Sequence, residues 1–139
     1  MTEKKHSAEY LEYRRRLSEI INRHVGVQAR IGAAELFAAV FGYAPDNKIN
    51  ATRALRSLVT DLRKDGIPII SSTASDGGYY LSSAGSDLEA FCKRFRSRAL
   101  NTLKIEARLR KITLPTLLGQ IAMSFATPKE DVTPPSQRP

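Results

Sequence analysis

Arginine and hydroxyl side chains recur at three- and four-residue spacing between positions 53 and 60 of the chain. An arginine guanidinium can pair in bidentate fashion with guanine O6 and N7 in the major groove of DNA, and hydroxyl groups bind bases or phosphates. These residue types and this spacing favour hydrogen-bonded recognition of a polyanion, and most directly of double-stranded DNA. Four of them share one side of a helix when successive residues are placed 100° apart: Arg53, Arg56, Ser57 and Thr60.

The opposite side of this segment is apolar, as a helix that packs on a core requires. Asn50 can cap the helix by accepting a backbone N–H, and Gly66 is typical of the residue just past a helix end. The predicted helix therefore runs from Ala51 to Asp65, with Asn50 as its cap, and turns its cations outward. An ordinary solvated helix with arginines opposite leucines is the alternative interpretation. The apolar positions are Ala51, Ala54, Leu55, Leu58, Val59 and Leu62.

A period of two then replaces the helical period and predicts a β-hairpin. Strands are expected at 67–73 and 79–82, joined by a turn that contains Asp76-Gly77, a strong hairpin signal. The turn region offers hydroxyls and backbone N–H groups to a phosphate, from Thr73 and Ser75, but no lysine or arginine. Asp76 would repel phosphate, and turn geometry alone also accounts for its presence.

The remaining elements are mostly helical. A short strand is predicted at 27–30, and apolar stripes at helical spacing predict helices at 9–24, 32–41, 86–112 and 115–125. The fold class is therefore mainly α with a small β-hairpin (α+β). Residues 1–8 are polar, and residues 126–139 are rich in proline, so both ends are expected to be disordered.

Net charge agrees with a polyanionic partner. The 139 residues contain 22 basic and 14 acidic side chains, a formal charge of +8, and the sequence pI is about 9.9. The positive charge is concentrated: residues 48–64 hold five basic side chains against Asp61, and residues 93–111 hold eight against Glu106. Several phosphate contacts would make binding strongly dependent on salt.

The long helix predicts self-association. Leu88, Phe91 and Ala107 belong to an apolar stripe along it, and at about 37 Å it is longer than the core of the preceding domain needs. A second copy would cover the stripe and present two recognition helices to a palindromic site. The alternative is that the chain folds back on itself at Pro115. The candidate oligomerisation residues are Phe95, Ala99, Leu103, Leu117, Leu118 and Ile121.

Several classes of function find no support in the sequence. A single cysteine allows no internal disulfide, and two isolated histidines, His6 and His24, indicate no metal site. No nucleotide-binding glycine loop, nucleophile elbow or paired carboxylates are found. No apolar run could span a bilayer. We therefore expect a cytoplasmic protein that is not an enzyme and needs no cofactor.

The order of the elements resembles a winged helix-turn-helix domain. Residues 53–69, followed by Gly78-Tyr-Tyr-Leu81, are similar to those of the biotin repressor and other bacterial regulators. The resemblance is closer to small winged-helix proteins of phages and prophages, through Asp87-Leu-Glu89 and Ser97-Arg-Ala99, and it covers residues 32–112. It implies that the third helix binds DNA and that the hairpin tip is a secondary contact. The turn at 42–49 is about twice the family's usual length.

These observations predict a winged helix-turn-helix domain at 9–85, followed by C-terminal helices at 86–125 that join copies of the chain. The predicted function is sequence-preferring binding of double-stranded DNA, in transcription regulation or as a replication accessory factor of a phage or prophage. A protein-interaction module, or a small terminase-like subunit of a replication or packaging assembly, is the alternative. The candidate DNA contacts are Lys48, Asn50, Thr52, Arg53, Arg56, Ser57, Thr60, Lys64, Thr73 and Ser75.

Overall fold

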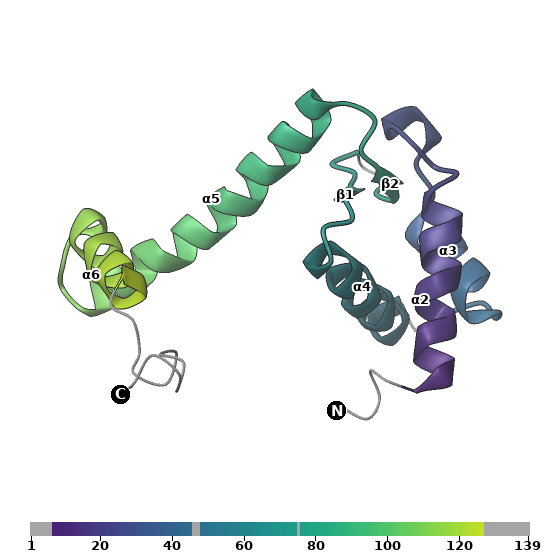
Figure 1. Cartoon of the computed structure of the whole chain (residues 1–139), viewed down its shortest axis with the longest axis horizontal. Coiled ribbons are helices and arrows are strands. Elements are labelled where there is room, and N and C mark those ends of the chain that lie inside the picture. The colour runs from purple at the N-terminus through teal and green to yellow at the C-terminus, as the bar shows by residue number, and fades with distance from the viewer. Residues whose placement is uncertain (1–6, 46–47, 75, 127–139) are drawn as a thin grey trace, which may run out of the picture. The chain divides into compact units, whose positions relative to one another are not determined.

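The computed structural model describes residues 7–45, 48–74 and 76–126, and for residues 48–52 it describes the backbone only. The chain is mainly helical with one two-stranded antiparallel hairpin, which confirms the predicted α+β class (Figure 1). The elements, in order, are α2 (Ala8–Ile21), η1 (Val27–Ala29), α3 (Ala33–Phe41), α4 (Lys48–Lys64), β1 (Ile69–Ser71), β2 (Tyr79–Leu81), α5 (Gly85–Leu109) and α6 (Leu114–Ala126).

The chain divides into two compact units, with the boundary between Cys92 and Lys93. Unit 1 thus extends to Cys92 and includes the first turns of α5, beyond the domain end predicted at residue 85. The reason is a small cluster in which Phe91 is buried together with Ile70 and Tyr80. Helix α5 continues from unit 1 into unit 2.

The core of unit 1 lies between α2, α3, α4 and the hairpin. Each helix supplies buried apolar side chains at helical spacing, and burial of such side chains stabilises the fold by about 1.5–3 kcal/mol each. The side chains that are almost fully buried in this core are Leu17, Ile21, Leu36, Val40, Leu55, Val59, Leu62 and Ile69.

The hairpin pairs Ile70 with Tyr80 at its centre, and β2 also pairs with Ile31 on its other side. Ile31 and Tyr79 exchange two backbone hydrogen bonds, from Ile31 N–H at 2.9 Å and from Tyr79 N–H at 2.8 Å. The strand predicted at 27–30 is wrong, because residues 27–29 form a 3-10 turn and the bridges to β2 come from Val25 and Ile31 on either side of it. Gly26, at φ 86°, begins this turn.

Helix α4 begins at Lys48, three residues before the predicted start at Ala51. Asn50 therefore lies inside the first turn and is not the N-cap, and the connection from Gly42 is correspondingly shorter than predicted. The predicted end at Gly66 is confirmed: its φ is 90°, and its N–H donates to Arg63 O at 2.9 Å. The N–H of Ile67 donates to Leu62 O at 3.1 Å, which completes a Schellman motif.

The other predicted helix ends are close to those observed. Helix α2 ends at Ile21 and not at His24, and α5 ends at Leu109 and not near Ile112. Lys111 adopts a left-handed conformation at φ 58°, and this terminates α5 in a second Schellman motif without glycine. No described helix is both long and apolar enough to cross a membrane.

Candidate nucleic-acid interface

The predicted DNA contacts of α4 whose side chains are described lie on the outward side of this helix. Its other side is fully engaged in the core, where Leu55 is 1% exposed and Leu62 is 2% exposed. Ala54, predicted to flank the apolar side, is exposed instead. The exposed contact residues, called the α4 face below, are Arg53, Arg56, Ser57, Thr60 and Lys64.

The carboxylate within α4 is turned away from this face by a contact with α2. Asp61 is half-buried and accepts a hydrogen bond from the hydroxyl of Tyr10. Burial first, and the Asp61 hydrogen bond second, raise the pKa of Tyr10 to about 12. Just past the helix end, Asp65 is paired with Arg14 of α2. The contacts with α2 thus pair Asp65 with a cation and hold Asp61 in a hydrogen bond with a neutral hydroxyl.

One arginine of α4 has a structural role that the sequence did not reveal. The Nε of Arg63 donates to Ile69 O at 2.7 Å, and its Nη2 donates to Ser71 Oγ at 2.9 Å. Its guanidinium also lies 4.8 Å from the centre of the Phe91 ring. Arg63 therefore joins α4 to β1 and to the start of α5, which fixes the hairpin beside the helix.

The α4 face lies next to the hairpin in space. Burial raises the pKa of the Tyr79 hydroxyl, while the positive charges of Arg63 and Arg56 act in the opposite direction. The hydrogen bond from Arg63 to Ile69 O holds β1 against the same helix that carries Arg56. The pattern of the α4 sequence places Arg56 outward, and the packing of the helix on the hairpin follows from tertiary contacts.

The hairpin tip contains a charge pair that was not predicted. The Nη2 of Arg30 lies 3.2 Å from one carboxylate oxygen of Asp76 and 3.3 Å from the other. Asp76, expected to repel phosphate, is therefore partly neutralised by a residue 46 positions earlier. No local pattern in the sequence could have indicated this pair. Thr73, the other described contact of this region, is exposed.

Four predicted contacts cannot be placed by their side chains. Lys48, Asn50 and Thr52 lie in the first turns of α4, where only the backbone is described, and Ser75 lies outside the described residues.

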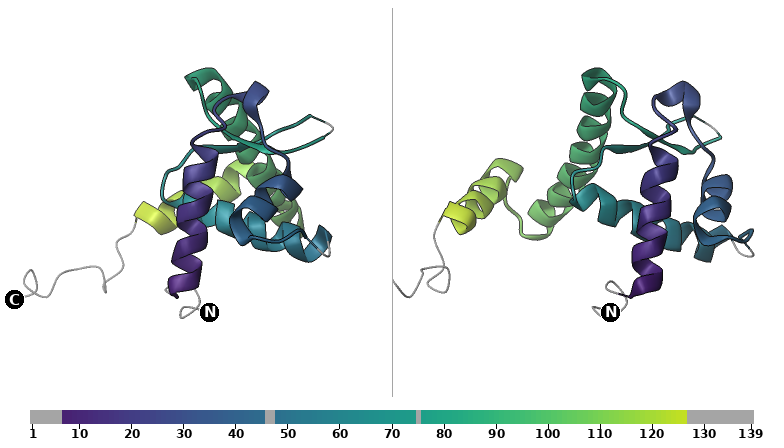
Figure 2. Two further views of the ribbon diagram at one scale, coloured as in Figure 1. Left: turned by 90° about the vertical axis from the view of Figure 1, so that its right-hand side faces the viewer. Right: turned by 45° about the vertical axis from the view of Figure 1, so that its right-hand side comes forward.

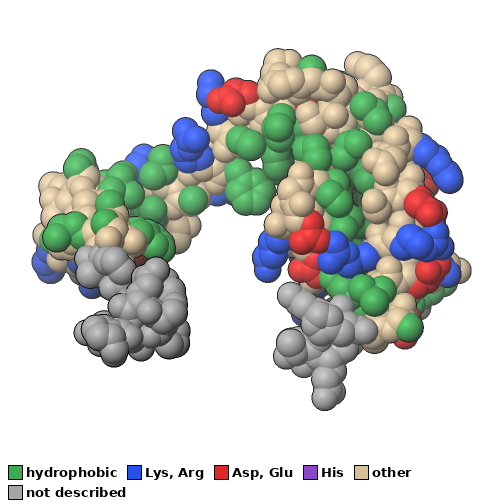
Figure 3. Space-filling view, viewed as in Figure 1, with side chains coloured by type: hydrophobic (Ala, Val, Ile, Leu, Met, Phe, Trp, Pro, Cys, Tyr) green, Lys and Arg blue, Asp and Glu red, His purple; other side chains and the backbone are tan. Residues whose placement is uncertain are grey.

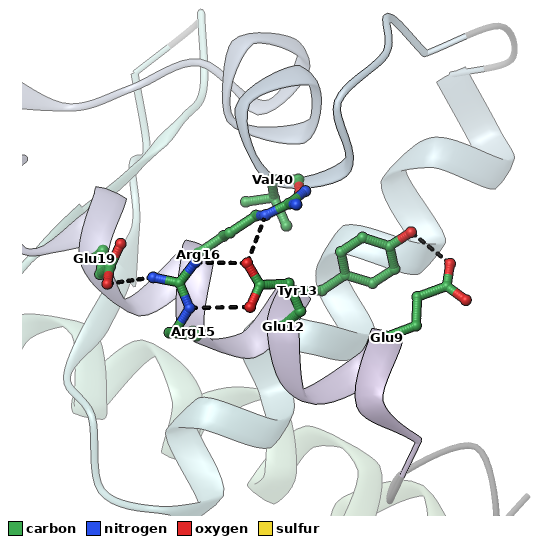
Figure 4. A network of polar contacts seen from close by, with 7 residues as sticks. All are labelled: Glu9, Glu12, Tyr13, Arg15, Arg16, Glu19 and Val40. Atoms are coloured by element: carbon green, nitrogen blue, oxygen red, sulfur yellow. Dashed lines mark hydrogen bonds and ion pairs between the residues drawn. The ribbon is translucent and has the colours of Figure 1, made fainter.

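Two arginines of α2, Arg15 and Arg16, are paired with carboxylates of their own helix (Figure 4). Arg15 contacts Glu12 at 2.5 Å and Glu19 at 2.5 Å, and Arg16 contacts Glu12 at 3.2 Å. Hydrogen bonds from Arg15, and then from Arg16, lower the pKa of Glu12 to about 2. These two cations are therefore poorly suited to binding phosphate.

Unit 2 combines excess positive charge with exposed apolar side chains. Glu106 is the one carboxylate in the sequence of residues 93–126, and Arg110 contacts it at 2.7 Å. Hydrophobic side chains gather over α6 in the space-filling view (Figure 3). Phe125 and Met123 of α6 are 85% and 70% exposed, and Leu109 of α5 is 78% exposed, so both helices leave apolar side chains in contact with solvent.

The predicted oligomerisation residues fall into different environments. Phe95, Ala99 and Leu118 are exposed, and Leu103 and Ile121 are half-buried. Leu117 is only 3% exposed and so belongs to the small core of its own unit, where it cannot contact a second copy without rearrangement.

Comparisons with protein-family models, with curated proteins and with solved structures find no match for this chain. Within the described residues, no group of three or more His, Cys, Asp or Glu side chains could hold a metal ion.

Proposed function

We propose that this protein binds double-stranded DNA, and that the α4 face enters the major groove. The observation that carries the proposal is the separation of two surfaces on one helix. Leu55, Leu58 and Leu62 are buried on one side, while arginines and hydroxyls are exposed on the other. An α-helix fits the major groove, where arginine distinguishes guanine and hydroxyls bind either bases or phosphates.

The hairpin supports this interface from the side. Arg63 fixes β1 against α4, and both views of Figure 2 place the hairpin tip and the first turns of α4 toward the same side of unit 1. A duplex bound to the α4 face would therefore meet the exposed hairpin region around Thr73. This use of a helix and a hairpin is the one implied by the resemblance to winged helix-turn-helix proteins.

The biological role that we propose is regulation of transcription, or assistance of replication, in a phage or prophage. A second copy, joined through unit 2, would present a second α4 face and so favour palindromic sites. Helix α6 has no charged side chain. Two copies can therefore meet there without like-charge repulsion, while the cations of α5 remain available to phosphates.

A double substitution tests the DNA-binding face. We expect Arg53→Ala plus Arg56→Ala to lower affinity for a duplex about 100-fold, because each arginine contact contributes about 1–3 kcal/mol and 1.4 kcal/mol is a tenfold change. The slope of log affinity against log salt should decrease by about 2. Fluorescence anisotropy with a labelled duplex at several salt concentrations measures both quantities.

The matched control is Arg15→Ala plus Arg23→Ala, which removes the same charge from exposed positions away from the α4 face. Its effect on affinity should be several-fold smaller. Equal losses in the two folded variants would show that only net charge matters, and unchanged affinity in the first variant would refute the proposal. Circular dichroism establishes that both variants fold.

The second candidate function is protein interaction through α6. The observation that favours it is the exposure of Leu118, Met123 and Phe125 on this uncharged helix. In this case unit 2 would join the protein to a replication or packaging assembly.

A further inference from the structure

Arg30, which pairs with Asp76 at the hairpin tip, is firmly positioned by its backbone. Arg30 follows η1 and precedes Ile31, which exchanges two hydrogen bonds with Tyr79. The backbone at Ile31 and the backbone of the hairpin approach each other closely, because a Cβ on Gly78 would lie 2.7 Å from Ile31 O. The side chain of Arg30 therefore starts from a fixed point at the base of the hairpin.

The contacts of the Arg30 guanidinium are incomplete. Its Nη1 donates to Val27 O at 3.0 Å, and its Nη2 faces both oxygens of Asp76. Those distances, 3.2 and 3.3 Å, exceed the 2.7–2.9 Å usual for a charge-assisted bond. The Nε is buried and has no acceptor among the described residues. An unsatisfied buried donor is costly, so this arrangement does not use the full binding capacity of the group.

The pair is also accessible to a ligand. The side chain of Arg30 is 28% exposed and that of Asp76 is 67% exposed. Exposed pairs of this kind are weak and are screened by salt. A phosphate offers the same kind of oxygen acceptors as a carboxylate, and arginine binds it in bidentate fashion. A phosphate group that reaches the hairpin can therefore compete with Asp76 for the guanidinium.

We propose that Arg30 is a phosphate-binding residue of the DNA interface, and that Asp76 holds its guanidinium in the absence of DNA and competes with the phosphate. This inference rests on the proposed function, because the phosphate is that of a duplex bound to the α4 face. Asp76 then sets the affinity: it neutralises Arg30 before binding and must release it on binding. The sequence alone suggested only that Asp76 repels phosphate.

A double-mutant cycle tests the competition, with Arg30→Gln, Asp76→Asn and the combined variant. The probe is a labelled mixed-sequence duplex of 30 base pairs, and affinity is measured by anisotropy at several salt concentrations. Arg30→Gln should weaken binding about 5- to 10-fold and decrease the salt slope by about 1. Asp76→Asn should strengthen binding about 5- to 10-fold, and this gain should disappear when Arg30→Gln is also present.

Glu89→Gln is the control for net charge, because Glu89 is an exposed carboxylate of unit 1 on α5. A gain from Asp76→Asn no larger than that from Glu89→Gln would overturn the proposal. So would an equal gain with and without Arg30. Arg30→Met, which also removes the charge, serves as the test variant if Arg30→Gln does not fold.

The cycle separates this inference from the proposed function. If Arg53→Ala plus Arg56→Ala abolishes binding while the Arg30 and Asp76 variants resemble their controls, only the role of Arg30 is lost. If the unaltered protein does not bind the duplex, both proposals are wrong.

Discussion

At the scale of single residues, position in the fold determines what an arginine does. Arg53 is exposed on α4, and Arg63, ten residues later on the same helix, is bound to the backbone of β1. Arg15 is paired with carboxylates of its own helix. An arginine bound as Arg63 is has fewer donors to offer an external anion, so counting cations along the chain overestimates the binding surface.

Gly78 gives a prediction at this scale. Its φ is 105°, and an added Cβ would lie 2.7 Å from Ile31 O, so Gly78→Ala should combine backbone strain with a steric clash. We expect a loss of about 2–4 kcal/mol in the free energy of unfolding, since strain of this kind costs about 1–3 kcal/mol before the clash is added. Urea unfolding followed by circular dichroism measures the change.

Gly77→Ala is the matched control. Gly77 also has a positive φ, 69°, but a Cβ there would have no heavy atom within 4 Å. Its cost should be confined to the left-handed conformation, about 1–2 kcal/mol. Equal losses at the two positions would show that the close approach to Ile31 does not constrain the hairpin.

At the scale of elements, the start of α5 is stabilised by a carboxylate in its first turn. The sequence pattern predicts this helix from residue 86, and the helix begins at Gly85. The carboxylate of Asp87 performs the capping: it accepts hydrogen bonds from the Ser82 hydroxyl at 2.6 Å and from Ser83 N–H at 3.1 Å. These bonds lower the pKa of Asp87 from 3.8 to about 2.

This cap predicts a pH dependence of stability. Since the pKa of Asp87 is lower in the folded state than in the unfolded state, its contribution is complete above about pH 4 and declines as the pH falls toward 2. Asp87→Ala should destabilise the protein at pH 5, and the difference from the unaltered protein should decrease toward pH 2. Thermal unfolding across this range measures it. A difference that stays constant down to pH 2 would contradict the capping role.

Hydrophobic periodicity predicts some elements of unit 1 correctly and one of them wrongly. The buried positions of α4 and its end at Gly66 follow from local rules, because an amphipathic pattern and a left-handed glycine act within a few residues. The 3-10 turn at η1 was predicted as a strand. The predicted strand, residues 27–30, is too short to show a period. The pairing between Ile31 and Tyr79 joins residues that are far apart along the chain.

At the scale of the whole molecule, unit 2 has few buried side chains for its length. Among the described residues from Lys93 onward, Ala107 and Leu117 are the hydrophobic residues that are fully buried. A pair of helices with so small a core gains little stability from its own packing. This observation favours a partner that covers the exposed apolar surface, and we propose a second copy of the chain.

The prediction at this scale concerns the mass of the protein in solution. Leu118→Ser plus Phe125→Ser should convert a dimer into a monomer, because it removes two exposed apolar groups from α6. Light scattering coupled to size-exclusion chromatography measures the mass. Leu11→Ser plus Val27→Ser, at exposed apolar positions of unit 1, should leave the dimer intact.

A monomeric unaltered protein would exclude self-association through unit 2. Deleting residues 114–139 then tests the second candidate function. Loss of a protein partner, with DNA binding retained, would favour the protein-interaction module.

The sequence by itself determined the helical segments, the hairpin and the two sides of α4, because each depends on side-chain period, glycine conformation and charge within short stretches of chain. Tertiary structure decided which charges remain available. Asp61 is bound by Tyr10, Arg63 by the hairpin and Arg30 by Asp76, each through a contact between residues of different elements. Such contacts depend on how the elements pack, and packing brings together residues whose separation along the chain follows no local period.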